Sequence, residues 1–145
     1  MMTFRVTARS AELFSGLVAP RVEPGAESSG SEWMRFLRDR VREKHIDATQ
    51  VSTVYVPDPH GTVNAVVAVS VDSPGDVAVG DVFVSIPTGV FAVFVPTGAL
   101  ADPIEDVWAQ VDECVMSGSI FRAYKEEVEV VTNTGEVELF ISIVL

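Results

Sequence analysis

The feature that most constrains the fold is an internal repeat. The chain contains two copies of one pattern, a strand segment followed by a helix and then a hairpin. Trp33 and Trp108 lie 75 positions apart, and the glycines of the two hairpin turns, Gly61 and Gly135, lie 74 positions apart. A single β-α-β-β unit would leave one helix face and one sheet edge exposed, so the two units are expected to pack against each other.

Two amphipathic helices are predicted, over residues 31–44 and 103–117. Ser29 has the spacing of a capping box with Glu32, and Asp102 precedes a proline that suits the first helical turn. The apolar stripes expected to be buried are Trp33, Phe36, Leu37 and Val41 in the first helix, and Ile104, Val107, Trp108, Val111 and Val115 in the second.

The remaining segments are rich in β-branched residues and are bounded by turn clusters, which predicts strands. These strands are residues 4–8, 13–22, 51–56, 63–71, 82–86, 90–95, 121–131 and 137–144. The expected fold class is α+β: duplicated β-α-β-β units with pseudo-twofold symmetry, an antiparallel sheet with two helices on one face, and a central ligand cleft. One domain is expected over residues 1–145, with halves at about 1–73 and 81–145.

Composition excludes several classes of function. Acids outnumber bases 21 to 10, for a net charge of −11, which disfavours direct contact with a nucleic-acid backbone. Cys114 is the single cysteine, and neither His45 nor His60 has a metal-ligand partner at helical spacing, so no metal or other cofactor is expected. No apolar run approaches the roughly 18 residues of a membrane span, so no membrane contact is expected and the predicted location is cytoplasmic.

The last hairpin carries the most informative polar side chains. Along residues 137–145 one alternating set of apolar side chains is expected to face the core. The opposite set contains Glu136, Glu138, Phe140 and Ser142. A face that mixes carboxylates with an aromatic ring suits either plain solvent or the lining of a cleft, and the sequence leaves both possibilities open.

The partner strand of this hairpin changes phase. The residues that suit the core are Phe121, Ala123, Val128 and Val130. The first two have the opposite parity to the last two, which predicts a bulge within residues 125–127. Four polar residues are then expected on the non-core face: Arg122, Tyr124, Glu127 and Glu129. This arrangement would bring Tyr124 close to Glu138. A carboxylate beside aromatic rings in an apolar cleft favours an organic cation, because the charge and the ring faces both attract it.

Five segments share the patterns of one known family. Residues 86–98, Ile-Pro-Thr-Gly-Val-Phe-Ala-Val-Phe-Val-Pro-Thr-Gly, resemble the pattern I-P-x-G-x-Y-A-x-F-x-x-x-G of GyrI-like small-molecule-binding domains, which also form the effector-binding domains of AraC- and MerR-type multidrug regulators. Residues 33–36 resemble the family's W-x-x-F segment, and residues 104–118 resemble its second helix with the Ser-Gly end. Residues 121–124 resemble its F-E-x-Y segment, and residues 138–143 resemble its E-I-Y-I-P-I segment. Phe91 stands at the tyrosine of the first pattern, and Arg122 stands at the acid of F-E-x-Y.

This resemblance implies a pseudo-twofold pair of β-α-β-β units with a ligand cleft at the seam between them. The candidate ligand-binding residues, taken from the resemblance and the strand pattern together, are Trp33, Tyr55, Phe91, Tyr124, Glu126, Glu127, Glu138 and Phe140. The leading hypothesis is a non-enzymatic effector-binding protein for flat, apolar, cationic compounds, with no catalytic residue. The alternatives are a small-molecule hydrolase that uses a cleft carboxylate as general base, and an acidic modulator of a protein partner such as DNA gyrase.

Overall fold

The computed structural model describes residues 4–145. Its elements, in chain order, are β1 (Arg5–Arg9), β2 (Glu12–Val22), α1 (Ala26–Ser29), α2 (Glu32–Lys44), β3 (Gln50–Pro57), β4 (Val63–Val71), the 3-10 turn η1 (Pro74–Asp76), β5 (Val82–Ile86), β6 (Gly89–Phe94), α3 (Pro103–Met116), β7 (Glu127–Thr132) and β8 (Val137–Ser142). No helix in this described part is long and apolar enough to cross a membrane.

The eight strands form one sheet in the order β1-β6-β8-β7-β3-β4-β2-β5, and every neighbouring pair is antiparallel. Strands β3 and β7 meet at its centre, and the order of elements outward from them is equivalent on both sides. The units β2-α2-β3-β4 and β6-α3-β7-β8 therefore repeat one arrangement, which confirms the α+β fold of duplicated β-α-β-β units. Both predicted hairpins, β3–β4 and β7–β8, are present.

The two strands that precede the repeated units exchange places between the halves. Strand β1 pairs with β6 of the second half, and β5 pairs with β2 of the first half. The pairing register continues without a shift from Arg5↔Val93 to Gly16↔Val82 across both junctions. Gly16 is required here, because a Cβ at this position would lie 2.0 Å from the carbonyl oxygen of Val67.

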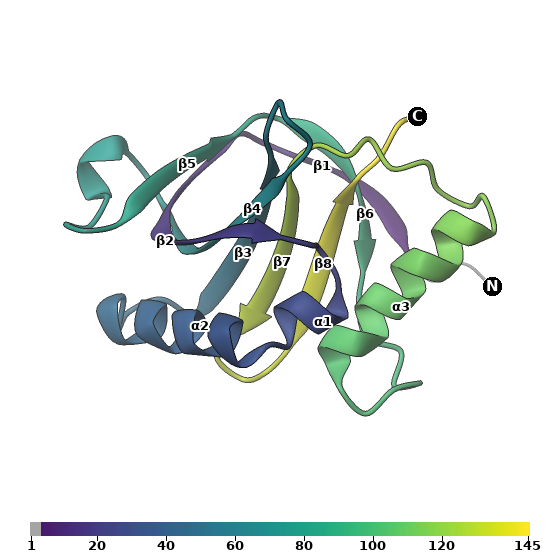
Figure 1. The fold of residues 1–145 in the computed structure, drawn as a ribbon, viewed down its shortest axis with the longest axis horizontal. Helices are drawn as coiled ribbons and strands as arrows, with labels where there is room; N and C mark the ends of the chain where they lie inside the picture. Colours follow the sequence, from purple (N-terminus) through teal and green to yellow (C-terminus); the bar gives the residue numbers. More distant parts are fainter. Residues whose placement is uncertain (1–3) are drawn as a thin grey trace.

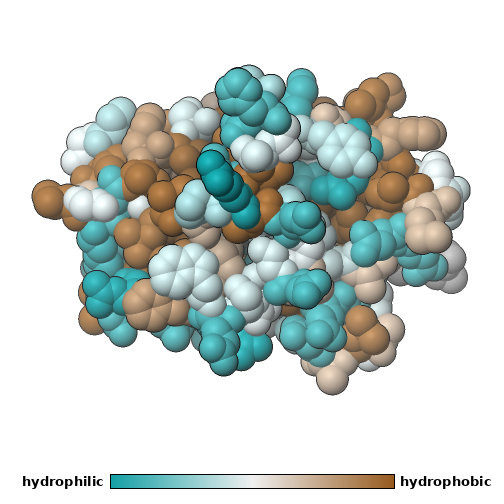
Figure 2. All heavy atoms as spheres, in the orientation of Figure 1, coloured by the Kyte–Doolittle hydropathy of each residue, from teal (hydrophilic) through white to brown (hydrophobic). Residues whose placement is uncertain are grey.

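All three helices cover one face of the sheet, with α2 under the first half and α3 under the second (Figure 1). The main hydrophobic core lies between this face and the helices. A second, smaller cluster, which includes Phe14, Val54 and Val128, lies on the opposite face of the strands. Both faces of the central strands are therefore buried, although Figure 2 shows apolar surface remaining at the β5 end, where Val79 and Phe83 are exposed.

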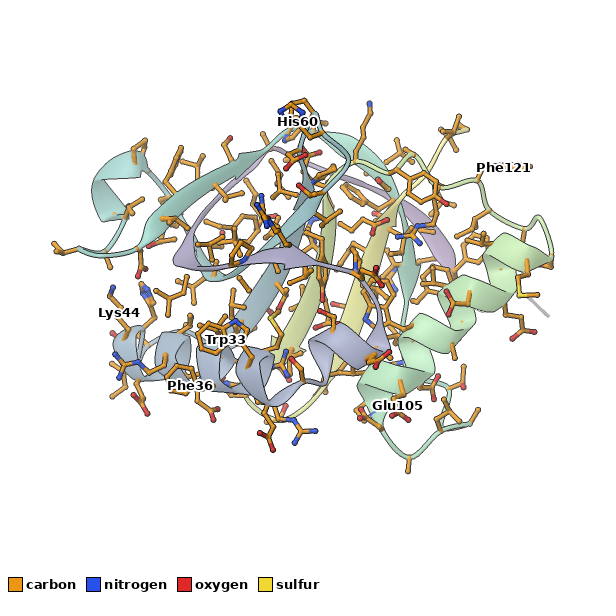
Figure 3. The ribbon with its side chains drawn as sticks, in the orientation of Figure 1. Trp33, Phe36, Lys44, His60, Glu105 and Phe121 are labelled. Carbon is orange, nitrogen blue, oxygen red and sulfur yellow. The ribbon has the colours of Figure 1, made fainter. Side chains whose placement is uncertain are left out.

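The phase of the first helix differs from the prediction. Trp33 is 54% exposed and stacks on Phe36 at the surface (Figure 3), whereas Met34 and Arg38 are buried. The repeat offset of 74 given by the hairpin glycines aligns Met34, rather than Trp33, with the buried Trp108. Leu37 and Val41 are buried as predicted, so the predicted stripe is wrong at Trp33 and Phe36. A shift of one residue rotates a helical side chain by about 100°, which places Met34 in the core and Trp33 outside it.

The helix ends were predicted with mixed success. Asp102 accepts a hydrogen bond from the backbone N–H of Ile104 and caps α3 as expected. Of the predicted stripe of α3, Trp108 is buried, but Val115 at the far end of the helix is exposed. Ser31, rather than Ser29, caps α2 by accepting a hydrogen bond from the Met34 backbone N–H. Ser29 instead belongs to α1, a four-residue helix that the sequence did not predict.

Candidate ligand-binding site at the seam

A pocket of about 450 Å³ opens at the seam between the halves, where the paired residues Tyr55 and Glu127 end the contact of β3 with β7. The first half contributes Pro24 and the turn between β3 and β4 with the ends of these strands, and the second half contributes the chain that leads into β7. The lining residues are Pro24, Tyr55, Pro57, Asp58, Pro59, Gly61, Val63, Arg122, Tyr124, Lys125 and Glu127. The expected cleft between the halves therefore exists, at one end of the central strand pair.

The chain that enters β7 is irregular because it holds more residues than its partner strand. Val128 pairs with Phe140, and the next bridge joins Arg122 to Ile143, so residues 123–127 lie opposite only residues 141 and 142. Tyr124 takes a left-handed conformation with φ of 55°, which is uncommon for a side-chain-bearing residue. The predicted phase change is thus real but larger than one residue.

This irregular chain directs Arg122 and Tyr124 to the pocket. It also leaves Phe121 exposed, so the prediction that Phe121 faces the core is wrong. In Figure 3 Phe121 lies beyond the end of α3, at the outside of the molecule.

Arg122 and Glu127 form an ion pair within the pocket. The Arg122 Nη2 donates to Glu127 Oε1 at 2.6 Å and its Nε donates to Oε2 at 3.2 Å. The two side chains are 15% and 4% exposed. Burial raises the pKa of the Glu127 carboxyl, and the charge and hydrogen bonds of Arg122 oppose that rise. The guanidinium also lies over the Tyr124 ring, 4.9 Å from its centroid.

A second carboxylate, Glu129, is fully buried between the sheet and the helices. Its Oε1 accepts a hydrogen bond from Trp108 Nε1 at 2.8 Å, and its Oε2 accepts one from Ser29 Oγ at 2.5 Å. Burial raises the pKa of the Glu129 carboxyl, and the hydrogen bonds from Ser29 and Trp108 and the charge of Arg38 oppose that rise. Three helices therefore converge on one carboxylate, because Ser29, Arg38 and Trp108 belong to α1, α2 and α3.

Tyr55 connects this buried cluster to the pocket. Its ring lines the pocket and meets the Trp108 ring edge-on, with the centroids 5.8 Å apart. Burial raises the pKa of the Tyr55 hydroxyl well above its ordinary value, and the nearby Glu129 raises it further. Within residues 4–145 the Tyr55 hydroxyl and Arg38 Nη1 are buried without a hydrogen-bond partner, although Arg38 Nη2 donates to the Ser29 carbonyl at 2.8 Å. Buried polar groups without a partner are rare in folded proteins.

The structure brings Tyr55, Tyr124 and Glu127 together in this pocket, but not the other five candidate residues. Trp33 lies on the exposed side of α2. Glu126 lines a separate, smaller hollow with Phe91. Phe140 contacts Phe91 and lies beneath the guanidinium of Arg9 on the sheet face away from the helices.

Glu138 also lies away from the pocket, so the expectation that the hairpin brings it close to Tyr124 is wrong. It pairs with Val130, whose side chain belongs to the cluster opposite the helices, and it forms a 3.2 Å ion pair with Arg5. Glu127 and Glu129 have the opposite parity and face the helices. The predicted common face of Glu127, Glu129 and Glu138 is therefore split between the two sides of the sheet.

Three residues of this region had no predicted role in a site: Ser29, Glu129 and Arg122. Glu129 carried a signal, because a carboxylate alternating with Val128 and Val130 is unusual in a strand that is buried on both faces. Arg122 was expected on the same non-core face as Tyr124, and it departs from the acid of the family pattern, but neither observation predicted a role in binding. Within residues 4–145, no group of three or more histidine, cysteine or acidic side chains is arranged to hold a metal ion.

The chain thus forms an antiparallel sheet built from two repeats, with helices on one face and a pocket at the seam. The family model described as Cass2, integron-associated effector binding protein, matches residues 25–143. The chain therefore belongs to this family. A search of curated protein sequences finds no significant match.

Solved structures support the same fold across nearly the whole chain. SAV2435, solved bound to tetraphenylphosphonium, is 14% identical with a TM-score of 0.74, and the match covers 99% of this chain and 94% of that one. An integron cassette protein from the mobile metagenome of Vibrio cholerae is 16% identical with a TM-score of 0.71, covering 97% and 95%. The C-terminal domain of EcmrR is 8% identical with a TM-score of 0.61, covering 98% and 97%. The family model and this shared fold together confirm the resemblance to GyrI-like effector-binding domains.

Proposed function

We propose that this protein is a non-enzymatic effector-binding protein whose ligand is a small, aromatic, cationic organic molecule held in the seam pocket. The proposal takes the two halves, about 1–73 and 81–145, as one binding unit. The observation that carries it is the joining of aromatic rings from both halves, Tyr55 and Tyr124, with the nearly buried carboxylate of Glu127 around one cavity.

The size and lining of the cavity support a small organic ligand. Its volume of about 450 Å³ falls within the roughly 300–1,000 Å³ usual for such pockets. The exposed Tyr124 ring offers stacking and cation–π contacts, and the buried Tyr55 ring forms part of the cavity wall. The family description as effector-binding proteins, and the tetraphenylphosphonium bound to SAV2435, support the same class of ligand.

The charge preference rests on two carboxylates that face the helices. Glu127 lies in the cavity wall, and Glu129 lies behind Tyr55. A carboxylate in a low-dielectric site attracts a cation more strongly than one in water does. A ligand with a delocalised positive charge loses little hydration on entering such a site, so it is favoured over a compact ammonium.

Calorimetry with two matched probes tests this function. Methyltriphenylphosphonium and triphenylphosphine oxide have similar shapes but differ by one charge. We expect the cation to bind with micromolar affinity or better, about −8 kcal/mol, and the neutral oxide to bind less tightly. At a hundredfold excess over Kd, the cation should stabilise the native state by about 2.7 kcal/mol, which a thermal-unfolding assay detects.

Variants distinguish this pocket from other surfaces. Tyr124→Ala should weaken both probes, because the ring contact is lost whatever the ligand's charge. Glu127→Gln should weaken the cation more than the oxide. Glu138→Gln is the matched control, since it removes an equivalent carboxylate outside the pocket and should change neither affinity. The proposed function would be contradicted if neither probe bound the wild-type protein. It would also be contradicted if Glu138→Gln weakened cation binding as much as Glu127→Gln does.

A hydrolase is the competing function that one observation favours. Glu129 is buried and its pKa is raised, as for a general base. However, both of its oxygens accept hydrogen bonds from Trp108 and Ser29, and it does not line the cavity. Steady turnover of an aryl ester, lost in Glu127→Gln or Glu129→Gln, would replace the binding function with the enzymatic one.

A further inference from the structure

The guanidinium of Arg122 already has the surroundings that a cationic ligand of the seam pocket would need. It is held by the Glu127 carboxylate through two hydrogen bonds and lies over the ring of Tyr124. An organic cation in the pocket would use the same carboxylate and the same ring face. Arg122 and such a ligand cannot both occupy this position.

The polar and ring contacts of the Arg122 side chain join it to two residues. Within residues 4–145 it donates hydrogen bonds to Glu127 and lies over the ring of Tyr124. Its backbone belongs to the irregular chain before β7, where a single bridge to Ile143 precedes five residues that lie opposite two. A long side chain on such a segment can turn outward to solvent without breaking the sheet.

We propose that Arg122 is a built-in competitor that determines which ligands enter the pocket. The inference rests on the proposed function and specifies it. A cation gains the Glu127 carboxylate only by displacing the guanidinium, whereas a neutral aromatic ligand can stack in the pocket while the Arg122–Glu127 pair stays intact. The pocket thus rejects weakly binding cations and admits those whose aromatic surface compensates for the broken pair.

The charges that line the cavity support this selectivity. Asp58 and Glu127 are balanced by Arg122 and Lys125 when Arg122 points inward. Rotation of Arg122 to solvent would leave two acids and one base, which is the charge balance that suits a cation. The ligand-free pocket therefore carries no net charge, and it acquires a negative one only when Arg122 is displaced.

Arg122→Gln tests the proposal by removing the charge while keeping a polar side chain. We expect the affinity for methyltriphenylphosphonium to rise about tenfold, equivalent to about 1.4 kcal/mol, with less than a threefold change for triphenylphosphine oxide. In a Glu127→Gln background the same substitution should give a much smaller gain, because it relieves charge repulsion but releases no carboxylate. This double-mutant cycle measures the competition itself and not the fold.

Two control variants separate competition from general electrostatics. Lys125→Gln removes the same unit charge from the same cavity without freeing a carboxylate, so its gain should be much smaller than that of Arg122→Gln. Arg9→Gln removes an arginine that is likewise paired with a glutamate, Glu12, and placed over a ring, that of Phe140, but outside the pocket. It should leave both affinities unchanged.

The outcomes separate this inference from the function beneath it. Unchanged or weaker cation binding in Arg122→Gln, while the wild type binds, overturns the competitor role and leaves the function standing. Equal gains in Arg122→Gln and Lys125→Gln also overturn it, in favour of a diffuse field. If neither the wild type nor Arg122→Gln binds either probe, both the function and the inference fail. Should Arg122→Gln not fold, Arg122→Met, which keeps the apolar stem, provides the same comparison.

Discussion

Replacing Trp108 with phenylalanine removes the indole N–H that is donated to Glu129 while keeping an aromatic ring in the core. The lost hydrogen bond is 2.8 Å long and ends on a fully buried carboxylate. Hydrogen bonds to charged groups contribute about 1.5–3 kcal/mol, and the smaller ring adds about 1 kcal/mol for the space it leaves. We therefore expect Trp108→Phe to lower the free energy of unfolding by about 2.5–4 kcal/mol.

Urea denaturation at pH 7 measures this change. Trp108→Ala should cost more than Trp108→Phe, because emptying a large aromatic site alone costs about 3–5 kcal/mol. In a Glu129→Gln background the acceptor is neutral, so Trp108→Phe should lose only a neutral hydrogen bond of about 0.5–1.5 kcal/mol. The coupling between the two sites should then be about 1 kcal/mol or more.

Two results would refute this account. A Trp108→Phe protein within about 0.5 kcal/mol of the wild type would show that the indole N–H does not stabilise the folded state. Additive effects of Trp108→Phe and Glu129→Gln would show that Glu129 is not the partner that matters.

Three further predictions concern single sites. Glu129→Gln should raise the free energy of unfolding at pH 8 but not at pH 4. The pKa of the Glu129 carboxyl is raised in the folded state, so the wild type loses stability as the pH rises above the ordinary value near 4.5. Equal effects of the substitution at both pH values in urea titrations would contradict this. Asp81→Asn should cost about 2 kcal/mol at pH 7. Burial of Asp81 is outweighed by hydrogen bonds from Lys44, Ser15 and His45, which lower its pKa, so the loss should shrink as pH falls below 3.8. Gly16→Ala should cost about 3 kcal/mol or more by overpacking, measured by thermal unfolding, because its Cβ would meet the Val67 carbonyl.

The order and pairing of the elements could be predicted because local signals agree with the repeat. Proline and glycine clusters mark both hairpin turns, and Asp102 with Pro103 marks the start of α3. The exchange of β1 and β5 between the halves could not be predicted. Strand partners at a sheet edge depend on the packing of the whole chain, and no local pattern encodes them.

The candidate site was harder to predict because alternation assigns a face only when one side of a sheet is exposed. Here both sides of the central strands are buried. Four residues of β7 are all buried: Val128, Val130, Glu127 and Glu129. Hydrophobicity therefore predicted that the valines face the helices, whereas the two glutamates do. The short helix α1 lacks any periodic pattern, and Ser29 was therefore interpreted as a cap instead of a partner of Glu129.

The two inward-facing carboxylates of β7 differ in how their charge is balanced, and this difference bears on the ligand. Glu127 is directly paired with a guanidinium, so it offers a cation nothing until Arg122 leaves. Glu129 accepts only neutral donors, with Arg38 near but not bonded to it, so its charge is less fully balanced. Tyr55 lines the cavity and contacts Trp108, which donates to Glu129. A cation in the pocket would consequently bind Glu127 by contact and Glu129 through the low-dielectric interior, and the second attraction persists whichever way Arg122 points.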